Sequence, residues 1–285
     1  MPLQLMKINM RMQQRSTFSG KVVWITGASS GIGRALALAF GASGATVAVS
    51  ARRQELLDVL VTEIEANGGK ARAFGCDVTA EKQLASCVRD IVDAFGRLDV
   101  AIANAGFGVT GRVTKMQESD WSRQLAVNVT GLALTAKHAI PLLQQTGGRL
   151  VLMGSVGAFL PNPGLSAYGA SKAAVHSIGE SLQVELMGSG VSCTTIHPGF
   201  VESNIARIDN EGRFHPDRSD PRPANLMWPT GKAAAVILRA IARRKKVFVF
   251  TGHGKIAVFL GRFFPVLARK LMAKAGNAMP PDTAG

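Results

Sequence analysis

Three polar side chains near the middle of the chain have the types and spacing of a proton-transfer site. Tyr168 is the only tyrosine, and Lys172 follows it by four residues, so a helix would place both side chains on one face. A phenol, with an ordinary pKa of about 10, needs a nearby cation to exchange a proton near neutrality. Ser155 follows the apolar run 150–154, which predicts a buried strand, and we expect its hydroxyl to face a substrate oxygen. These residues are candidates for general acid–base catalysis, although a Tyr-x-x-x-Lys pair alone is most often a chance pair.

A glycine-rich turn lies between a predicted strand (21–26) and a predicted helix (34–40). It consists of Gly27, Ala28, Ser29, Ser30, Gly31, Ile32 and Gly33. In this context, backbone N–H groups and the helix dipole can receive a pyrophosphate. The spacing G-x-x-x-G-x-G differs from the G-x-G-x-x-G fingerprint, so the turn by itself is weak evidence.

The second predicted strand, 46–50, runs into Arg52 and Arg53 and carries no acid at its end. An NAD-preferring site usually has an acidic residue there to accept hydrogen bonds from ribose hydroxyls. Two guanidiniums suit a 2′-phosphate instead, which favours NADP(H) over NAD(H). The alternative is that both arginines simply open the next helix in solvent, where they match the helix dipole poorly.

Further strand ends carry residues suited to one crevice. The strand 71–76 leads to Asp77 and Val78, of which Asp77 is either a turn-capping residue or a partner of an adenine ring. The strand 98–103 leads to Asn104, Ala105 and Gly106, and the strand 191–196 leads to Pro198. The alternation of strands and helices predicts an α/β fold with one doubly wound parallel sheet and helices on both faces. Because ligands lie beyond the carboxyl ends of such strands, Gly27, Asn104, Ser155 and Pro198 should face one crevice.

Asn128 lies in the middle of a long predicted helix, 119–145. Asparagine is a poor interior helix residue, because its amide competes for backbone partners. Its apolar neighbours and Gly131 indicate a local kink or a buried polar role. A tolerated residue without a role is the alternative.

The composition and the charge distribution limit the classes of protein to which the chain can belong. A chain of 285 residues with 47% apolar content fits one α/β domain, and three widely spaced cysteines fit buried thiols in a cytosolic protein rather than a metal or disulfide pattern. The segments 1–15 and 232–274 contain no acid, and their basic residues account for the whole net charge of +14. That distribution favours an anionic membrane surface or cofactor phosphates over nucleic acid. We expect neither a signal peptide nor a spanning helix.

We divide the chain into a flexible extension (1–17), a catalytic domain (18–252) and a basic tail (253–285). Within the domain, the polar, proline-containing loop 204–227 is long enough to be a substrate lid. The tail is amphipathic if helical over 255–274, with a break at Pro265. It either docks on its own body or on a second subunit, or lies in a membrane interface.

Taken together, these stretches resemble the NAD(P)-dependent short-chain dehydrogenase/reductase family over about residues 18–250, and imply a Rossmann-type fold. Asn128, Ser155, Tyr168 and Lys172 match the family's catalytic tetrad in order and spacing. The resemblance implies cofactor contacts from Gly27, Ser29, Ser30, Gly31, Ile32, Gly33, Arg52, Asp77, Val78, Asn104, Ala105, Gly106, Tyr168, Lys172, Pro198, Gly199, Val201 and Ser203. Ser203 replaces the threonine of many members but keeps the hydroxyl. Ser30 lacks the basic residue that some NADP-preferring members carry.

The expected function is hydride transfer between NADP(H) and an alcohol or carbonyl substrate, as in a carbonyl reductase, with no metal. The loop 204–227 and the apolar tail favour a small lipophilic substrate such as a steroid, a retinoid or a long-chain carbonyl compound. A 3-oxoacyl group or a sugar is the alternative. The alternative is an NADP(H)-binding sensor or scaffold without turnover. The resemblance implies a homodimer or homotetramer that pairs through the helices 119–145 and 166–187. We expect a cytoplasmic protein, with or without peripheral membrane contact through the tail.

Overall fold

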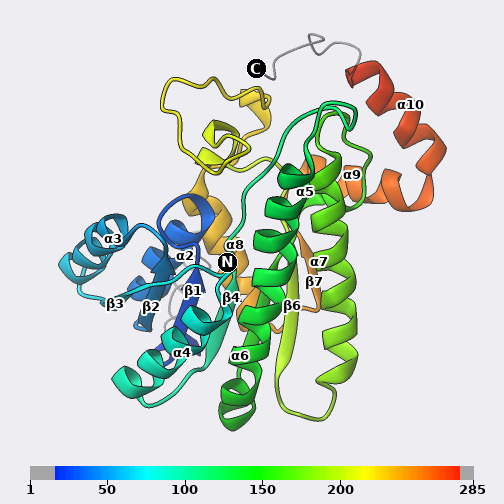
Figure 1. The fold of residues 1–285 in the computed structure, drawn as a ribbon. Helices are drawn as coiled ribbons and strands as arrows, with labels where there is room; N and C mark the ends of the chain where they lie inside the picture. The colour runs from blue at the N-terminus through cyan, green and yellow to red at the C-terminus, as the bar shows by residue number, and fades with distance from the viewer. Residues whose placement is uncertain (1–16, 277–285) are drawn as a thin grey trace, which may run out of the picture.

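Seven parallel strands form one sheet in the computed structural model, which describes residues 17–276 (Figure 1). The order across the sheet is β3-β2-β1-β4-β5-β6-β7. The strands are β1 (Val22–Thr26), β2 (Thr46–Ala51), β3 (Lys70–Gly75), β4 (Val100–Ala103), β5 (Arg149–Met153), β6 (Ser192–His197) and β7 (Val247–Val249). The direction of winding reverses between β1 and β4, as the predicted doubly wound sheet requires. The predicted extension 1–17 lies almost wholly outside the described residues.

Helices cover both faces of the sheet, and β1 shows why. Its five residues are all buried, and they alternate between two cores: Val23 and Ile25 pack into one, Val22 and Trp24 into the other. The first core includes residues of α2 (Gly31–Ala42), α3 (Gln54–Ala66) and α8 (Thr230–Ala242). The second includes residues of α4 (Glu81–Phe95), α6 (Leu132–Thr146) and α7 (Ser166–Glu185). Cys76, Cys87 and Cys193 are buried free thiols, as expected.

The predicted long helix around Asn128 is interrupted. It consists of α5 (Glu118–Leu125), a π-helical turn η1 (Ala126–Gly131) and α6. Asn128 lies in the π-helical turn with no exposed surface, so the local irregularity and the buried polar position occur together. Gly131 lets this turn approach Val78, since a Cβ there would lie 2.7 Å from the Val78 Cγ2 atom.

The loop 204–227 lies beyond the carboxyl ends of the strands, and Figure 1 shows it in yellow above the sheet. Its regular structure is limited to two short 3-10 turns, η3 (Asn204–Arg207) and η4 (Ala224–Leu226). The tail forms two helices, α9 (Gly252–Phe263) and α10 (Pro265–Gly276), with the predicted break at the proline. None of the helices in the described part of the chain is long and apolar enough to span a membrane.

Candidate active site

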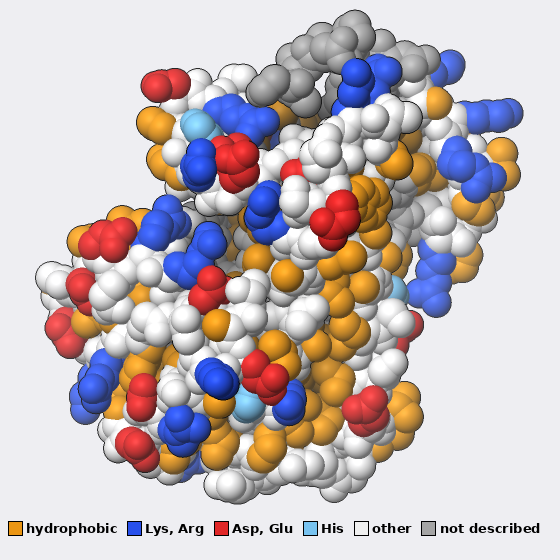
Figure 2. Space-filling view, in the orientation of Figure 1, with side chains coloured by type: hydrophobic (Ala, Val, Ile, Leu, Met, Phe, Trp, Pro, Cys, Tyr) orange, Lys and Arg blue, Asp and Glu red, His pale blue; other side chains and the backbone are white. Residues whose placement is uncertain are grey.

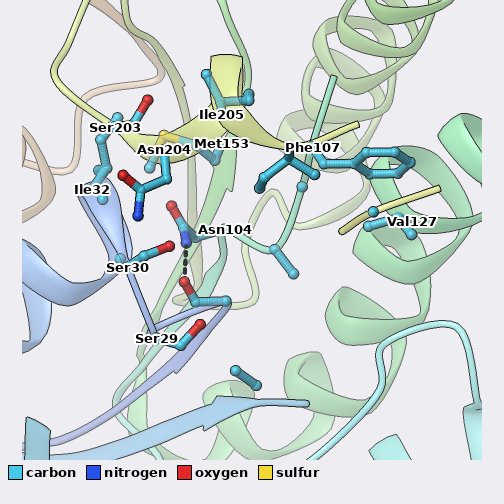
Figure 3. A pocket seen from close by; sticks show the side chains of 18 of the residues that line it. Ser29, Ser30, Ile32, Asn104, Phe107, Val127, Met153, Ser203, Asn204 and Ile205 are labelled. Atoms are coloured by element: carbon cyan, nitrogen blue, oxygen red, sulfur yellow. Dashed lines mark hydrogen bonds between the residues drawn. The ribbon is translucent and has the colours of Figure 1, made fainter. Parts of the chain in front are cut away.

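A cavity of about 260 Å³ lies beyond the carboxyl ends of the strands, where the winding of the sheet reverses. Every cofactor residue expected from the sequence lines this cavity, and so do all members of the expected catalytic tetrad except Asn128. Figure 3 shows Ser29, Ser30 and Ile32 on one side of the cavity and Phe107 and Val127 on the other. The cavity therefore joins the glycine turn to the tyrosine and lysine within one crevice.

The glycine turn is held tightly against the end of β4. The Nδ2 atom of Asn104 donates to the carbonyl oxygens of Thr26 (2.9 Å) and Gly27 (3.2 Å). A Cβ at Gly33 would lie only 2.5 Å from that nitrogen and 2.5 Å from the Gly27 oxygen. Gly27 and Gly31 adopt φ values of +65° and +57°, which other residues rarely adopt. Glycine at these positions lets the backbone take this shape.

The first turn of α2 has the properties of an anion site. Ser30, its N-cap, makes no side-chain capping bond, and the turn contains no acidic residue. Free backbone N–H groups and the positive end of the helix dipole are therefore directed to the crevice. These residues fit the diphosphate of a dinucleotide.

Two arginines, Arg52 and Arg53, line the part of the crevice that follows β2. Arg53 donates to the Ser29 hydroxyl (3.0 Å), whereas Arg52 makes no hydrogen bond or ion pair within residues 17–276. The Arg52 guanidinium thus remains available to a further phosphate. Asp77 lines the same end and accepts hydrogen bonds from the amide and hydroxyl of Thr79, so its turn-capping role is present.

At the other end of the crevice, α7 places Tyr168 and Lys172 on one face, one turn apart. The Lys172 Nζ atom donates to the Met153 carbonyl oxygen (2.9 Å) and lies 5.7 Å from the centroid of the Tyr168 ring. The Ser155 hydroxyl oxygen accepts a hydrogen bond from the Gly157 amide (3.1 Å). A substrate oxygen placed between Ser155 and Tyr168 would meet two hydroxyl groups.

Burial shifts the pKa values of both titrating groups. It lowers the pKa of Lys172 to about 8, and it raises the pKa of the Tyr168 phenol. A hydrogen bond with Ser155 and the positive charge of Arg222 oppose the rise at Tyr168 but do not outweigh burial. The expectation that a nearby cation brings the phenol pKa toward neutrality is therefore wrong for this structure, because desolvation of the phenolate dominates.

Asn128 acts on the backbone beside the crevice. Its Oδ1 atom accepts from the Phe107 amide (3.1 Å), and its Nδ2 atom donates to the Phe107 carbonyl oxygen (3.0 Å) and to the Ser171 hydroxyl (3.1 Å). Gln124, one turn earlier and fully buried, also donates to the Phe107 carbonyl oxygen. Sequence reasoning missed Gln124, although its i, i+4 spacing to Asn128 was a usable signal.

The loop 204–227 contributes a residue that sequence reasoning also missed. Arg222 lines the crevice, pairs with Asp220 (2.7 Å), and donates to the carbonyl oxygens of Val201 (3.0 Å) and Ser203 (2.9 Å). The Asn210 amide forms two 2.9 Å hydrogen bonds with the backbone of Thr110, a hundred residues earlier. No local sequence pattern predicts the position of Arg222, because only the folded loop brings it near Tyr168.

His197 supports the turn that carries Ser155 and does not line the crevice. It is fully buried, with its Nδ1 atom 3.0 Å from the Ser155 carbonyl oxygen and its ring against Phe159 and His176. Burial lowers the pKa of His197 to about 4. The folded state therefore holds a neutral ring at neutral pH.

We expect this histidine to make the fold acid-sensitive. The pKa of His197 in the folded state lies below its ordinary value of 6.5. Its contribution to the free energy of unfolding is therefore fully present above pH 6.5 and is lost as pH falls toward 4. The loss is about 3 kcal/mol of unfolding free energy over that window. In urea unfolding at several pH values, His197→Asn should flatten the dependence of the unfolding free energy on pH. Equal slopes for wild type and His197→Asn would contradict the assignment.

A model of the short chain dehydrogenase family matches residues 21–213, and the chain belongs to this family. The chain is 37% identical over 185 residues to the 3-oxoacyl-(acyl-carrier-protein) reductase FabG of Thermotoga maritima, covering 65% of this chain and 75% of that protein. It is 31% identical over 235 residues to an uncharacterized oxidoreductase of Staphylococcus aureus, covering 82% and 96%. A Burkholderia phymatum short chain dehydrogenase/reductase in complex with NAD superposes with a TM-score of 0.76 at 25% identity, covering 94% and 99%. The chain is thus a member of an oxidoreductase family that binds nicotinamide cofactors.

Proposed function

We propose that this protein is an NADP(H)-dependent carbonyl reductase, or alcohol dehydrogenase in the reverse direction, acting on a lipophilic substrate. One observation carries the proposal: Ser155, Tyr168 and Lys172 lie at one end of a crevice whose other end carries the glycine turn and Arg52. A bound nicotinamide cofactor supplies or accepts the hydride. The protein's own residues handle the substrate oxygen and its proton.

Tyr168 is the proposed general acid in the reducing direction. Its raised pKa keeps the phenol protonated, so that it can donate its proton to the carbonyl oxygen as negative charge develops there. The Ser155 hydroxyl donates a second hydrogen bond to that oxygen. Lys172, with a pKa of about 8, is mainly an ammonium at neutral pH and stabilises the tyrosinate left behind. Asn128 holds the backbone at Phe107, and its proposed role in a water-mediated proton relay rests on family resemblance.

Apolar side chains support a lipophilic substrate. Phe107, Val127, Met153, Ile205 and Ile208 line the crevice near the catalytic residues. Two of them, Ile205 and Ile208, belong to the loop 204–227, which supports its proposed role as a substrate lid. An apolar ketone, an aldehyde or a 3-oxoacyl thioester would bury its hydrocarbon part against these residues.

The preference for NADP(H) rests on Arg52. Removing a guanidinium that pairs with a phosphate costs about 1.5–3 kcal/mol, so Arg52→Ala should raise the KM for NADPH about tenfold to a hundredfold. The KM for NADH should change by less than about threefold, because NADH has no 2′-phosphate. Arg89→Ala, on the exposed side of α4, is the control. An equal loss with both coenzymes would contradict the assignment.

The reaction class is tested by NADPH oxidation against a panel of apolar ketones, aldehydes and 3-oxoacyl thioesters. Turnover with at least one of them supports the proposal. Tight NADPH binding without turnover on any compound would favour the alternative, a cofactor sensor or scaffold.

We also propose that the protein is a cytoplasmic homo-oligomer that pairs through α5, α6 and α7. Leu125 on α5 and Val184 on α7 are exposed, with 38% and 64% of their surface accessible, and Met187, just after α7, is 66% exposed. Light scattering on Val184→Asp, compared with wild type, would show whether this face carries the contact.

A further inference from the structure

The apolar face of α9 points away from the rest of the protein. Ile256, Phe259 and Phe263 follow each other at spacings of three and four residues, and 62%, 54% and 62% of their surfaces are exposed. The opposite face carries Gly254, which is buried, and Gly261, where a Cβ would clash with the Phe159 carbonyl oxygen. The helix therefore docks on the protein through small residues and presents its large apolar residues to solvent.

The exposed surface continues onto α10. The Phe259 ring lies 5.2 Å from the Phe263 ring and 5.7 Å from the Phe264 ring, at the break between the helices. Beyond the break, Leu267 and Leu271 are also about half exposed. We call this surface the tail patch; it comprises Ile256, Phe259, Phe263, Phe264, Val266, Leu267 and Leu271. The sequence left open whether the tail docks on its own body or on a second subunit, or lies in a membrane interface. Within one chain, the residues of the tail patch stay exposed and do not dock on the rest of the protein.

The charged residues of the two helices that carry the tail patch are all positive. The helices that carry it also bear Lys255, Arg262, Arg269, Lys270 and Lys274, and residues 221–276 contain no acid. Figure 2 shows blue Lys and Arg side chains interspersed with orange hydrophobic ones at the upper right, where Figure 1 places α9 and α10. A second copy of the patch would bring like charges together, whereas an anionic surface would be complementary.

We propose that the tail patch binds an anionic lipid bilayer and lies in its interface. Each helix has twelve residues and spans about 18 Å, which suits a helix lying in the plane of the surface. The apolar side chains would enter the boundary between headgroups and acyl chains, and the lysines and arginines would contact lipid phosphates. This inference does not depend on the proposed reaction.

Contacts of α9 place this surface beside the substrate end of the crevice. Gly261 packs on Phe159, four residues after Ser155. The His253 Nε2 atom accepts a hydrogen bond from the Phe200 amide (3.0 Å), two residues after Pro198. A bilayer bound at the tail patch would therefore lie next to the two loops that flank the catalytic residues, where a lipophilic substrate could enter from lipid.

Co-sedimentation of the full chain with vesicles tests the proposal. The vesicles are phosphatidylcholine alone or phosphatidylcholine containing phosphatidylglycerol. We expect binding to the anionic vesicles that weakens at high salt. The double substitution Phe259→Ser/Phe263→Ser should weaken it at least about tenfold, and Arg262→Gln/Lys270→Gln about fivefold per charge. Val59→Ser/Val113→Ser and Lys82→Gln/Arg89→Gln, at exposed positions elsewhere, are the matched controls and should bind as wild type.

Thermal unfolding and NADPH binding show whether each variant is folded. Absence of binding to anionic vesicles, or equal binding by the Phe259→Ser/Phe263→Ser variant and its control, would overturn the proposal. Light scattering tests the other candidate occupant of the tail patch, a second copy of the chain. A loss of oligomers in the tail-patch variant, with no vesicle binding by wild type, would assign the surface to a second copy of the chain.

Discussion

Replacing Tyr168 by phenylalanine should lower kcat about 10²–10⁴-fold while leaving the Kd for NADPH within about threefold of wild type. The substitution removes one oxygen and keeps the ring that packs beside Lys172. Without the phenol, Ser155 keeps a hydroxyl beside the proposed position of the substrate oxygen, but a serine is too weak an acid to replace the tyrosine. Steady-state kinetics with NADPH and an active carbonyl compound measure the first quantity, and titration calorimetry measures the second.

Ser155→Ala is the informative companion to Tyr168→Phe. It removes a hydrogen bond to the developing charge but leaves the proton donor, so we expect a smaller loss in kcat. Retained turnover in Tyr168→Phe would refute the role of Tyr168. A loss that came with weakened NADPH binding would show that the substitution had disturbed the crevice instead.

Replacing Lys172 by methionine should make the protein more stable and much less active. Lys172 is only 5% exposed, and burial lowers its pKa from an ordinary 10.5 to about 8. Holding the ammonium in the fold below pH 8 therefore costs about 3 kcal/mol. Methionine removes this cost but leaves the Met153 carbonyl oxygen without its donor, so we expect a net gain of about 1–2 kcal/mol. Loss of the cation beside the tyrosinate should lower kcat at least about 10²-fold.

The pH dependence of that gain identifies its cause. The folded pKa lies below the unfolded one, so the penalty is complete below pH 8, declines from pH 8 to 10.5 and vanishes above. Urea unfolding at about pH 7 and about pH 9.5 should therefore show a smaller advantage for Lys172→Met at the higher pH. Lys115→Met, at an exposed position, is the control. A variant that is less stable than wild type at pH 7, or whose advantage is independent of pH, would contradict this account.

The fold followed from periodicity because the strands of a parallel sheet are buried on both faces. The apolar run before Thr26 was enough to predict β1, and glycines at the turn marked the start of α2. The polar residue Asn128 in an apolar helical segment indicated that the helix would be interrupted there. Its form as a π-helical turn was not predicted, and neither were the hydrogen bonds of Asn128 to Phe107, which lies 21 residues earlier.

The candidate site was predictable where residues lie at strand ends, and less so elsewhere. Gly27, Asn104 and Ser155 were placed in one crevice because parallel strands end at the same edge. Arg222 was not, because its position depends on how a long irregular loop folds back onto Ser203. The direction of the Tyr168 pKa shift could not be predicted from the sequence either, because it results from burial by residues distant in the chain.

Transfer of deuterium from NADPH labelled with deuterium at both C4 positions to a carbonyl substrate tests the central claim most directly. We predict that an apolar ketone incubated with the protein yields an alcohol with deuterium on the carbinol carbon, detected by mass spectrometry, and that Tyr168→Phe yields almost none. Tight NADPH binding with no deuterium in any alcohol across the panel would contradict the account and identify the protein as a cofactor-binding member without this reaction.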